Sequence, residues 1–358
     1  MKCRRSELAS ALIARLKSSE LSVPVSSGSR SGPEIWPNQK LELLEWYSLP
    51  QMSFRPEESG PVPGQETEEK KALLRIAEEV ERYLLTGESD PLSSAWPGSI
   101  LDRARRAHDE LRGALVNVVR ARTKELAHAP LPVTDTVALT RRKVEPMVRG
   151  LFPRAEQDAV LAALEQSVVF TTSENIERLL RCCNFDWTAW TLANLYLASL
   201  RADLLGKDAP AIVGLSEETT CYVSPRYFAE DDPFADFIVH EAAHVFHNCK
   251  RATIGLSETR RKQWLLDIDY LKRETFAYAC EAYARVIERG KRRAQRLALA
   301  EEYSRAGHIS DERVDAGEVA SIVREAAASR NGWKIIHTRC AQEHRELAMV
   351  TDSREKTN

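Results

Sequence analysis

The sequence predicts a mostly α-helical fold with one small β-sheet, in which a helical N-terminal region precedes a second domain. Apolar residues recur at helical spacing through most of the chain after residue 66. Two short segments rich in β-branched and aromatic residues, 211–216 and 219–224, form the one clear break in that pattern. These two observations favour a single strand pair within an otherwise helical protein.

Length and composition exclude several classes of protein. The chain has 358 residues, of which 43% are hydrophobic and 29% charged, so it can form two domains with a substantial core. Its net charge is −2, and its basic clusters are interleaved with acidic residues, as on solvated helix faces. We therefore expect no nucleic-acid partner.

Cysteine usage and the N-terminal sequence predict a cytoplasmic protein. Seven cysteines without a CxxC pair argue against a disulfide framework and against a cysteine-based zinc ribbon. Glu7, Arg15, Lys17 and Glu20 interrupt the first apolar positions, which predicts an amphipathic helix and not a secretory signal. No apolar run approaches the roughly 18 residues that a membrane span needs, so we expect no membrane association.

Passages rich in proline, glycine and serine interrupt the first hundred residues and predict linkers or loops. We expect three parts along the chain. An amphipathic helix and an extended segment occupy 1–66, a helical N-terminal domain occupies 67–170, and a domain carrying the candidate site occupies 171–358.

Apolar stripes predict the helices of the N-terminal domain. Segments 66–85 and 100–128 each place apolar residues along one face at helical spacing. The stripes contain Leu73, Ile76, Val80, Tyr83 and Leu84 in the first segment, and Leu101, Ala104, His108, Leu111, Leu115 and Val118 in the second. We interpret His108 as a packed or boundary histidine. The helical pattern continues through 137–152, 159–170 and 186–205.

The sequence DDPFADFIVHEAAHVFHN, which starts at Asp231, predicts a helix with Asp232 as N-cap and Pro233 in its first position. An apolar face would contain Ile238, Ala242 and Val245. His240 and His244 lie four residues apart, so their imidazoles would share a neighbouring face and reach one zinc ion at about 2.0–2.1 Å. Glu241 would lie beside that ion, where a general base is needed. The alternative is an ordinary helix that contains these residues by chance.

The third ligand must come from elsewhere in the chain. The pattern HExxHxxGxxH is excluded, because His247 stands at the glycine position and Lys250 at the histidine position. Segment 264–290 predicts a helix with the polar stripe Glu274, Tyr278, Glu281 and Arg285, and with the apolar residues Trp264, Ile268, Leu271, Phe276, Ala279 and Tyr283 toward the core or its margins. If Glu274 and Glu281 are buried, they require a partner or a metal ion. The alternative is a solvated polar stripe, which requires neither.

HEAAH at 240–244, followed by ETFAYA at 274–279, resembles the gluzincin group of zinc metallopeptidases, with similarity to ImmA/IrrE-like and lethal-factor-like peptidases. The resemblance covers roughly residues 209–289 and implies a zincin-like catalytic domain. It implies that His240, His244 and Glu274 bind Zn²⁺ and that Glu241 is the catalytic base. Glu281 is either a support for the site or, in a shifted alignment, the third ligand itself.

Several further residues are candidates near this site. Tyr278 is the preferred transition-state donor because it shares a helical face with Glu274; the other candidates are Tyr270, Tyr222, His308 and His337. His247 could bind substrate or orient a ligand, and the favoured interpretation is a polar residue at the end of the helix. Cys249 and Cys280 are interpreted as packed residues.

These observations predict a zinc-dependent metallopeptidase that hydrolyses peptide bonds of an intracellular protein or peptide, with Glu241 activating zinc-bound water. The strand pair before the helix would offer an edge for an extended substrate. The N-terminal helical region would recognise substrate or a regulatory partner. Two alternatives stay open: a helical interaction protein with a structural or degenerate HExxH, and a zinc hydrolase of non-peptide amides or esters.

Overall fold

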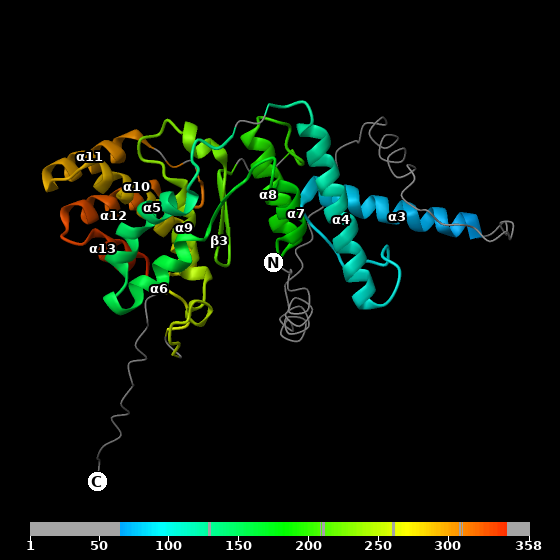
Figure 1. Ribbon diagram of the computed structural model, residues 1–358, viewed down its shortest axis with the longest axis horizontal. Coiled ribbons are helices and arrows are strands. Elements are labelled where there is room, and N and C mark those ends of the chain that lie inside the picture. Colours follow the sequence, from blue (N-terminus) through cyan, green and yellow to red (C-terminus); the bar gives the residue numbers. More distant parts are fainter. Residues whose placement is uncertain are drawn as a thin grey trace, which may run out of the picture. The chain divides into compact units, whose positions relative to one another are not determined.

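The computed structural model describes residues 65–127, 130–207, 209, 212–259, 262–307, 309 and 311–341 (Figure 1). Within these residues the chain is mostly helical, with one three-stranded sheet, which confirms the predicted fold class. The predicted helix and extended segment at 1–66 lie outside the described residues, except for Gln65 and Glu66. No described helix has both the length and the apolar character that a membrane span requires.

Residue contacts divide the chain into two compact units. Among the described residues, those within 65–125, 174–197 and 202–209 form unit 1, and those within 126–173, 198–201 and 212–341 form unit 2. This division differs from the predicted boundary between residues 170 and 171. Residues 126–173 belong with the C-terminal part because a strand within them pairs with a later strand, and residues 174–197 return to pack on the N-terminal helices.

Unit 1 is built from α3 (Gln65–Thr86), α4 (Ile100–Thr123), α7 (Ile176–Cys182) and most of α8 (Asp186–Ser199). Ser99 and Asp102 form a capping box at the start of α4. The buried guanidinium of Arg112 donates from Nε to Asp186 Oδ1 at 2.8 Å and ties α4 to the start of α8. Of the predicted stripes, Val80, Tyr83, Leu111 and Leu115 are buried, whereas Leu73 and Leu101 are exposed.

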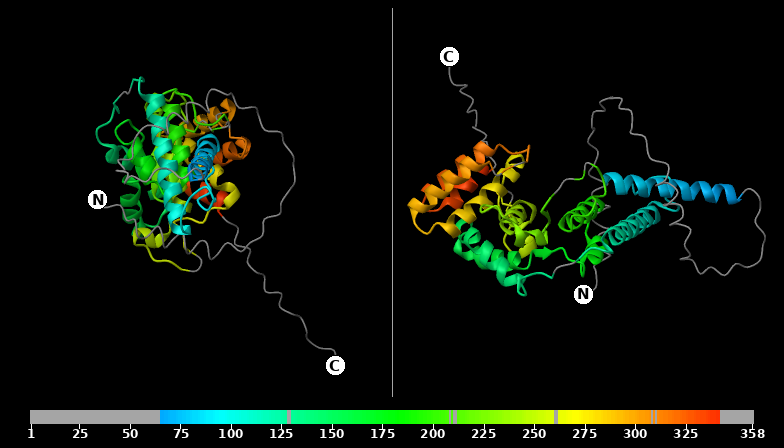
Figure 2. Two further views of the ribbon diagram at one scale, coloured as in Figure 1. Left: turned by 90° about the vertical axis from the view of Figure 1, so that its right-hand side faces the viewer. Right: turned by 90° about the horizontal axis from the view of Figure 1, so that it is seen from above.

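Unit 2 contains α5 (Thr136–Leu151), α6 (Arg154–Glu165), α9 (Phe237–Asn248), α10 (Arg273–Arg289), α11 (Arg293–Ala306), α12 (Ala316–Ala328) and α13 (Gly332–Cys340). Helix α9 packs against the sheet on one side and against α10 and α5 on the other. Helices α11, α12 and α13 lie across α10 from the sheet (Figures 1 and 2). The two helices that carry the candidate site therefore lie in the middle of this unit.

The sheet has the order β1-β3-β2. Strands β2 (Gly214–Glu217) and β3 (Thr220–Val223) form an antiparallel hairpin, which confirms the predicted strand pair, although both strands are shorter than predicted. The prediction of helix through 159–170 is wrong at its end, because Val168–Phe170 is strand β1, parallel to β3. The β-branched Val168 and Val169 follow a helix directly, so local periodicity cannot separate them from it; pairing with β3 decides their conformation.

Helix α9 begins one turn later than predicted, with Asp236 as N-cap in place of Asp232. Asp232 instead closes a turn, in which its Oδ1 accepts from the N–H of Phe234 at 2.8 Å. The side chain of Asp236 is buried and pairs with Lys143 Nζ of α5 at 2.9 Å. This tertiary contact fixes the buried Asp236 side chain at the start of α9 and favours it as the cap, whereas the half-buried Asp232 belongs to the preceding turn.

Helix α10 begins at Arg273, so the prediction of helix from residue 264 is wrong for its first third. Two isolated β-bridges, Lys250 with Trp264 and Ile268 with Ala341, hold that segment in an extended conformation. The short 3₁₀ helix η3 (Tyr270–Lys272) then leads into α10, with Asp269 as its cap. The same change leaves Leu271 83% exposed, whereas Phe276, Ala279 and Tyr283 are buried as predicted.

Candidate metal centre

Helix α9 presents His240 and His244 one turn apart, with ring centroids separated by 5.1 Å. The apolar face of the helix is anchored in the core, because Ile238, Ala242 and Val245 are almost completely buried, as predicted. A helix held along its whole apolar face keeps the two imidazoles in a fixed relation to each other.

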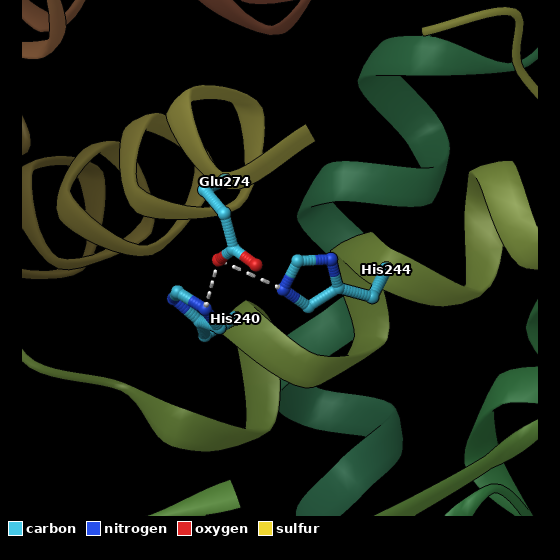
Figure 3. A group of neighbouring side chains, drawn as sticks. All are labelled: His240, His244 and Glu274. Carbon is cyan, nitrogen blue, oxygen red and sulfur yellow. Dashed lines mark ion pairs between the residues drawn. The ribbon is translucent and has the colours of Figure 1, made fainter. Parts of the chain in front are cut away.

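Helix α10 packs against α9 and brings Glu274, in its first turn, to the two imidazoles (Figure 3). Glu274 Oε2 lies 3.7 Å from His240 Nε2 and 3.5 Å from His244 Nε2. The three ligand atoms all lie within 4.8 Å of one another. Two imidazole nitrogens and one carboxylate oxygen are a donor set found in catalytic zinc sites, so these residues could hold a metal ion.

Glu281 lies behind His240, on the side away from Glu274. His240 Nδ1 donates to Glu281 Oε2 at 2.9 Å, and the backbone N–H of Asp236 donates to Oε1 at 2.7 Å. Both oxygens of Glu281 are therefore engaged, and the hydrogen bond leaves His240 Nε2 free to face Glu274. The sequence left open whether Glu274 or Glu281 is the third ligand. In the structure Glu274 faces both histidines, whereas Glu281 contacts His240.

The charges of the cluster are strongly coupled. Burial by itself would lower the pKa of His240, but hydrogen bonds to Glu274 and Glu281 outweigh burial and raise the pKa to about 10. Burial by itself would raise the pKa of Glu274, and hydrogen bonds to His240 and His244 hold it well below its usual range. The cluster therefore attracts a positive charge, either protons on the imidazoles or a metal cation that replaces them.

Glu241 is buried beside the cluster, and this burial raises the pKa of its carboxyl group, while the charges of His244 and His240 oppose the rise. Gly214, the first residue of β2, lies against this carboxylate. A Cβ atom added to Gly214 would stand 2.3 Å from Glu241 Oε1 and 2.6 Å from Cγ. The edge strand thus passes over Glu241 at a distance that only glycine permits.

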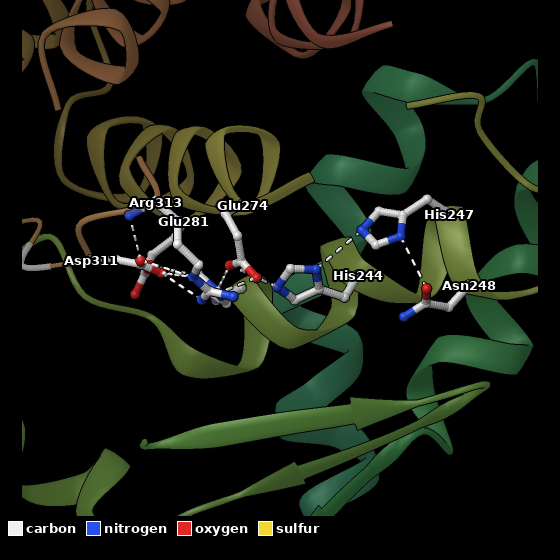
Figure 4. Close-up of polar contacts among 8 residues, drawn as sticks. His244, His247, Asn248, Glu274, Glu281, Asp311 and Arg313 are labelled. Carbon is white, nitrogen blue, oxygen red and sulfur yellow. Dashed lines mark hydrogen bonds and ion pairs between the residues drawn. The ribbon is translucent and has the colours of Figure 1, made fainter. Parts of the chain in front are cut away.

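Tyr278 and Arg313 complete the surroundings of the cluster. The ring of Tyr278 meets the ring of His240 edge-on, with 4.6 Å between centroids. Arg313, from the connection between α11 and α12, places a terminal guanidinium nitrogen 3.4 Å from Glu274 Oε1 and also pairs with Asp311 (Figure 4). Sequence reasoning missed Gly214, Arg313 and Asp311, because no local pattern links them to HEAAH.

His247 occupies the last turn of α9 and is buried against His244 (Figure 4). The atoms His244 Nδ1 and His247 Nε2 are 3.1 Å apart, and His247 Nδ1 lies 3.1 Å from Asn248 Oδ1. Burial and the neighbouring His244 and Arg273 lower the pKa of His247 to about 3. His247 thus lies at the end of the helix, as the favoured interpretation has it, and its ring also contacts His244.

The remaining sequence candidates have varied positions. Tyr222 is buried in β3, Tyr270 is 76% exposed on η3, and His337 belongs to α13. His308 lies outside the described residues. The thiols of Cys249 and Cys280 are buried, and burial raises the pKa of both, as is usual for packed cysteines.

Comparisons of the chain with protein-family models, with curated proteins and with solved structures returned no match.

Proposed function

We propose that this protein is a single-zinc metallopeptidase that hydrolyses peptide bonds of a protein or peptide substrate. One observation carries the proposal: His240 Nε2, His244 Nε2 and Glu274 Oε2 converge next to the buried carboxylate of Glu241. A solvated polar stripe on α10 would not bring Glu274 onto both histidines of α9. The arrangement also agrees with the resemblance of HEAAH and ETFAYA to gluzincins.

In this proposal His240, His244 and Glu274 hold the metal, and Glu281 keeps His240 in the tautomer whose Nε2 is free. Bound zinc would supply Lewis-acid polarisation of the scissile carbonyl group and of water. A carboxylate acceptor behind a ligating histidine fixes the ring orientation and raises its basicity. Glu281 therefore supports the site and does not compete for the metal.

Glu241 acts as the general base. Its carboxylate would accept a proton from the attacking water, and burial raises its pKa, which makes the carboxylate a stronger base. The close approach of Gly214 restricts the rotamers open to this side chain. Tyr278, beside His240, is the donor that would stabilise the developing oxyanion.

The β2 edge offers a place for the substrate. Within the described sheet β2 is an outer strand, and its first residue already lies on the catalytic carboxylate. An extended peptide that pairs with β2 would pass directly across Glu241 and the cluster. Backbone pairing gives affinity with little sequence selectivity, which leaves recognition of a particular substrate to other surfaces, including those of unit 1.

The first experiment is zinc quantitation on purified protein. We expect about one zinc per chain in the wild type and in His108→Ala, a control histidine in α4, and loss of zinc in His240→Ala and His244→Ala. Full retention of zinc in both α9 variants would contradict the proposed centre.

A second pair of variants tests the two glutamates of α10. Glu274→Ala should lose zinc, whereas Glu281→Ala should weaken zinc binding by roughly 10–100-fold, the usual cost of removing a partner behind a ligand. The reverse ranking would make Glu281 the ligand. A wild type without zinc would favour the interaction protein, and zinc with hydrolysis of small amides but not of peptides would favour the non-peptide hydrolase.

A further inference from the structure

We propose that His247 and Asn248 are positioning residues that form a neutral hydrogen-bond relay behind His244 and hold it in the tautomer whose Nε2 is free to bind metal. The inference rests on the proposed metal centre and adds to it the means by which the second histidine is oriented. The relay lies on the far side of His244 from Glu274 (Figure 4).

The direction of each hydrogen bond follows from the last member of the relay. Asn248 Oδ1 can only accept, so His247 Nδ1, which lies 3.1 Å away, must carry a hydrogen. A metal ion on His244 Nε2 requires the ring hydrogen of His244 to sit on Nδ1, so the His247 Nε2 atom that faces Nδ1 must present a lone pair. That lone pair accepts from His244 Nδ1 at 3.1 Å, which leaves His244 Nε2 without a hydrogen, at the atom that faces Glu274.

The opposite direction of the relay is incompatible with metal binding at this position. If the Asn248 amide were turned so that its nitrogen donated to His247 Nδ1, His247 Nε2 would carry the hydrogen and donate to His244 Nδ1. The hydrogen of His244 would then sit on Nε2, where it would block coordination. The oxygen of Asn248, acting through His247, therefore determines that Nε2 of His244 is the nitrogen that can bind a cation.

The two histidines of α9 are held by different chemistry. His240 has the charged carboxylate of Glu281 behind it, whereas His244 has a neutral ring. Glu241, Glu274 and Glu281 already place three carboxyl groups around the cluster, and a fourth would raise the cost of burying like charges together. A neutral relay orients His244 without adding to that charge.

The relay is also local to one helix. His247 follows His244 by three residues and Asn248 by four, so both lie one turn along the same face of α9. His244 and His247 are buried, so water does not compete for the bond between their rings. The support behind His244 therefore comes from α9 itself, whereas the support behind His240 comes from Glu281 of α10.

The test compares zinc dissociation constants, measured by competition with a chromophoric chelator at one pH, for two pairs of variants. His247→Leu removes the acceptor for His244, and His247→Gln restores a neutral acceptor oxygen. Asn248→Leu removes the acceptor for His247, and Asn248→Asp keeps an acceptor oxygen and cannot donate when ionised. We expect both leucine variants to weaken zinc binding by roughly 10–100-fold, with Gln and Asp restoring most of the affinity.

Two further measurements separate positioning from packing. The melting temperatures of the zinc-free variants report packing alone, and a purely structural role would lower them without changing zinc affinity. Nitrogen-15 NMR of the histidine rings reports tautomers directly, and both His244 and His247 should carry hydrogen on Nδ1. If His247→Leu fails to fold, Asn248→Leu and Asn248→Asp still test the relay.

The outcomes distinguish the relay from the metal centre. Unchanged zinc affinity in the folded leucine variants, or hydrogen on His247 Nε2, would overturn the relay and leave the metal centre intact. Loss of zinc in Asn248→Asp would show that an acceptor oxygen at residue 248 does not hold His244 in its metal-binding tautomer, and would also overturn the relay. A wild type that binds no zinc would overturn both.

Discussion

Gly214→Ala provides a sharp test of the site, because it adds one methyl group at the point where β2 meets Glu241. The new Cβ would lie 2.3 Å from Oε1, 2.6 Å from Cγ and 2.7 Å from Cδ of Glu241. Contacts below 3.0 Å are essentially never observed for Cβ atoms, so β2 or Glu241 must move by at least 0.7 Å, the difference between 3.0 Å and 2.3 Å. Because the contacts include Cγ as well as two atoms of the carboxylate, rotation of the carboxylate alone does not relieve the clash.

The displacement sets the size of the expected effect. Moving a catalytic group by about 1 Å costs on the order of 10²-fold in rate, and overpacking a buried site costs about 1–3 kcal/mol of stability. We therefore expect Gly214→Ala to cut peptide hydrolysis by about 10²-fold and to lower the melting temperature. Zinc content should stay at one per chain, because the added methyl group meets Glu241 and none of the three ligands is among its nearest contacts.

The assay follows cleavage of a fluorogenic peptide, chosen from a proteome-derived library that the wild type cleaves, together with zinc content and melting temperature. Gly113→Ala is the matched control, since a Cβ at Gly113, in α4, has nothing within 4 Å. That control should keep full activity and gain up to about 1 kcal/mol from helix propensity. If Gly214→Ala matches the wild type in both rate and melting temperature, then β2 does not press on Glu241 and our account of the edge strand is wrong.

Three further predictions address the base and the two buried ion pairs. Glu241→Gln should keep its zinc and its melting temperature while turnover falls by roughly 10²–10⁴-fold; a zinc-loaded variant that cleaves at the wild-type rate would mean that another group activates water. Lys143→Met should lower the free energy of unfolding by about 3–5 kcal/mol, measured by urea denaturation, because it leaves the buried carboxylate of Asp236 without its partner. Burial would raise the pKa of Asp186, but hydrogen bonds to His108 and Arg112 and the charge of Arg112 lower it to about 2. Ionised Asp186 therefore stabilises the folded protein fully above pH 3.8, the ordinary pKa of the group, and this stabilisation is lost as the pH falls toward 2. Asp186→Asn should be less stable at pH 7 and should lack that acid-dependent loss in a urea titration against pH.

The helical core of the site could be predicted from sequence because its information is local. His240, Glu241 and His244 lie within five consecutive residues, and the period of the α-helix alone places both imidazoles on one face. Ile238, Ala242 and Val245 are buried as predicted for the same reason. The β2–β3 hairpin was likewise predictable, since two β-rich segments separated by a short turn pair with each other.

Features that depend on partners far along the chain could not be predicted in this way. Val168–Phe170 continues a helical pattern, and its pairing with β3 makes it a strand. Asp232 and Asp236 are both acceptable caps, and the buried contact with Lys143 favours Asp236. Segment 264–269 has helical periodicity, but β-bridges to Lys250 and Ala341 hold it extended. In each case a tertiary contact outweighs a local preference of about 1 kcal/mol or less.

The same distinction applies to the chemistry of the site. The sequence by itself determined the pair of histidines and the glutamate between them, because residues of one helix are related by its geometry whatever surrounds it. Only the tertiary structure decided that Glu274 faces both histidines and that Glu281 stands behind one of them, because both glutamates lie on the same stripe of α10. The way α10 packs on α9 selects between two residues that helical periodicity makes equivalent.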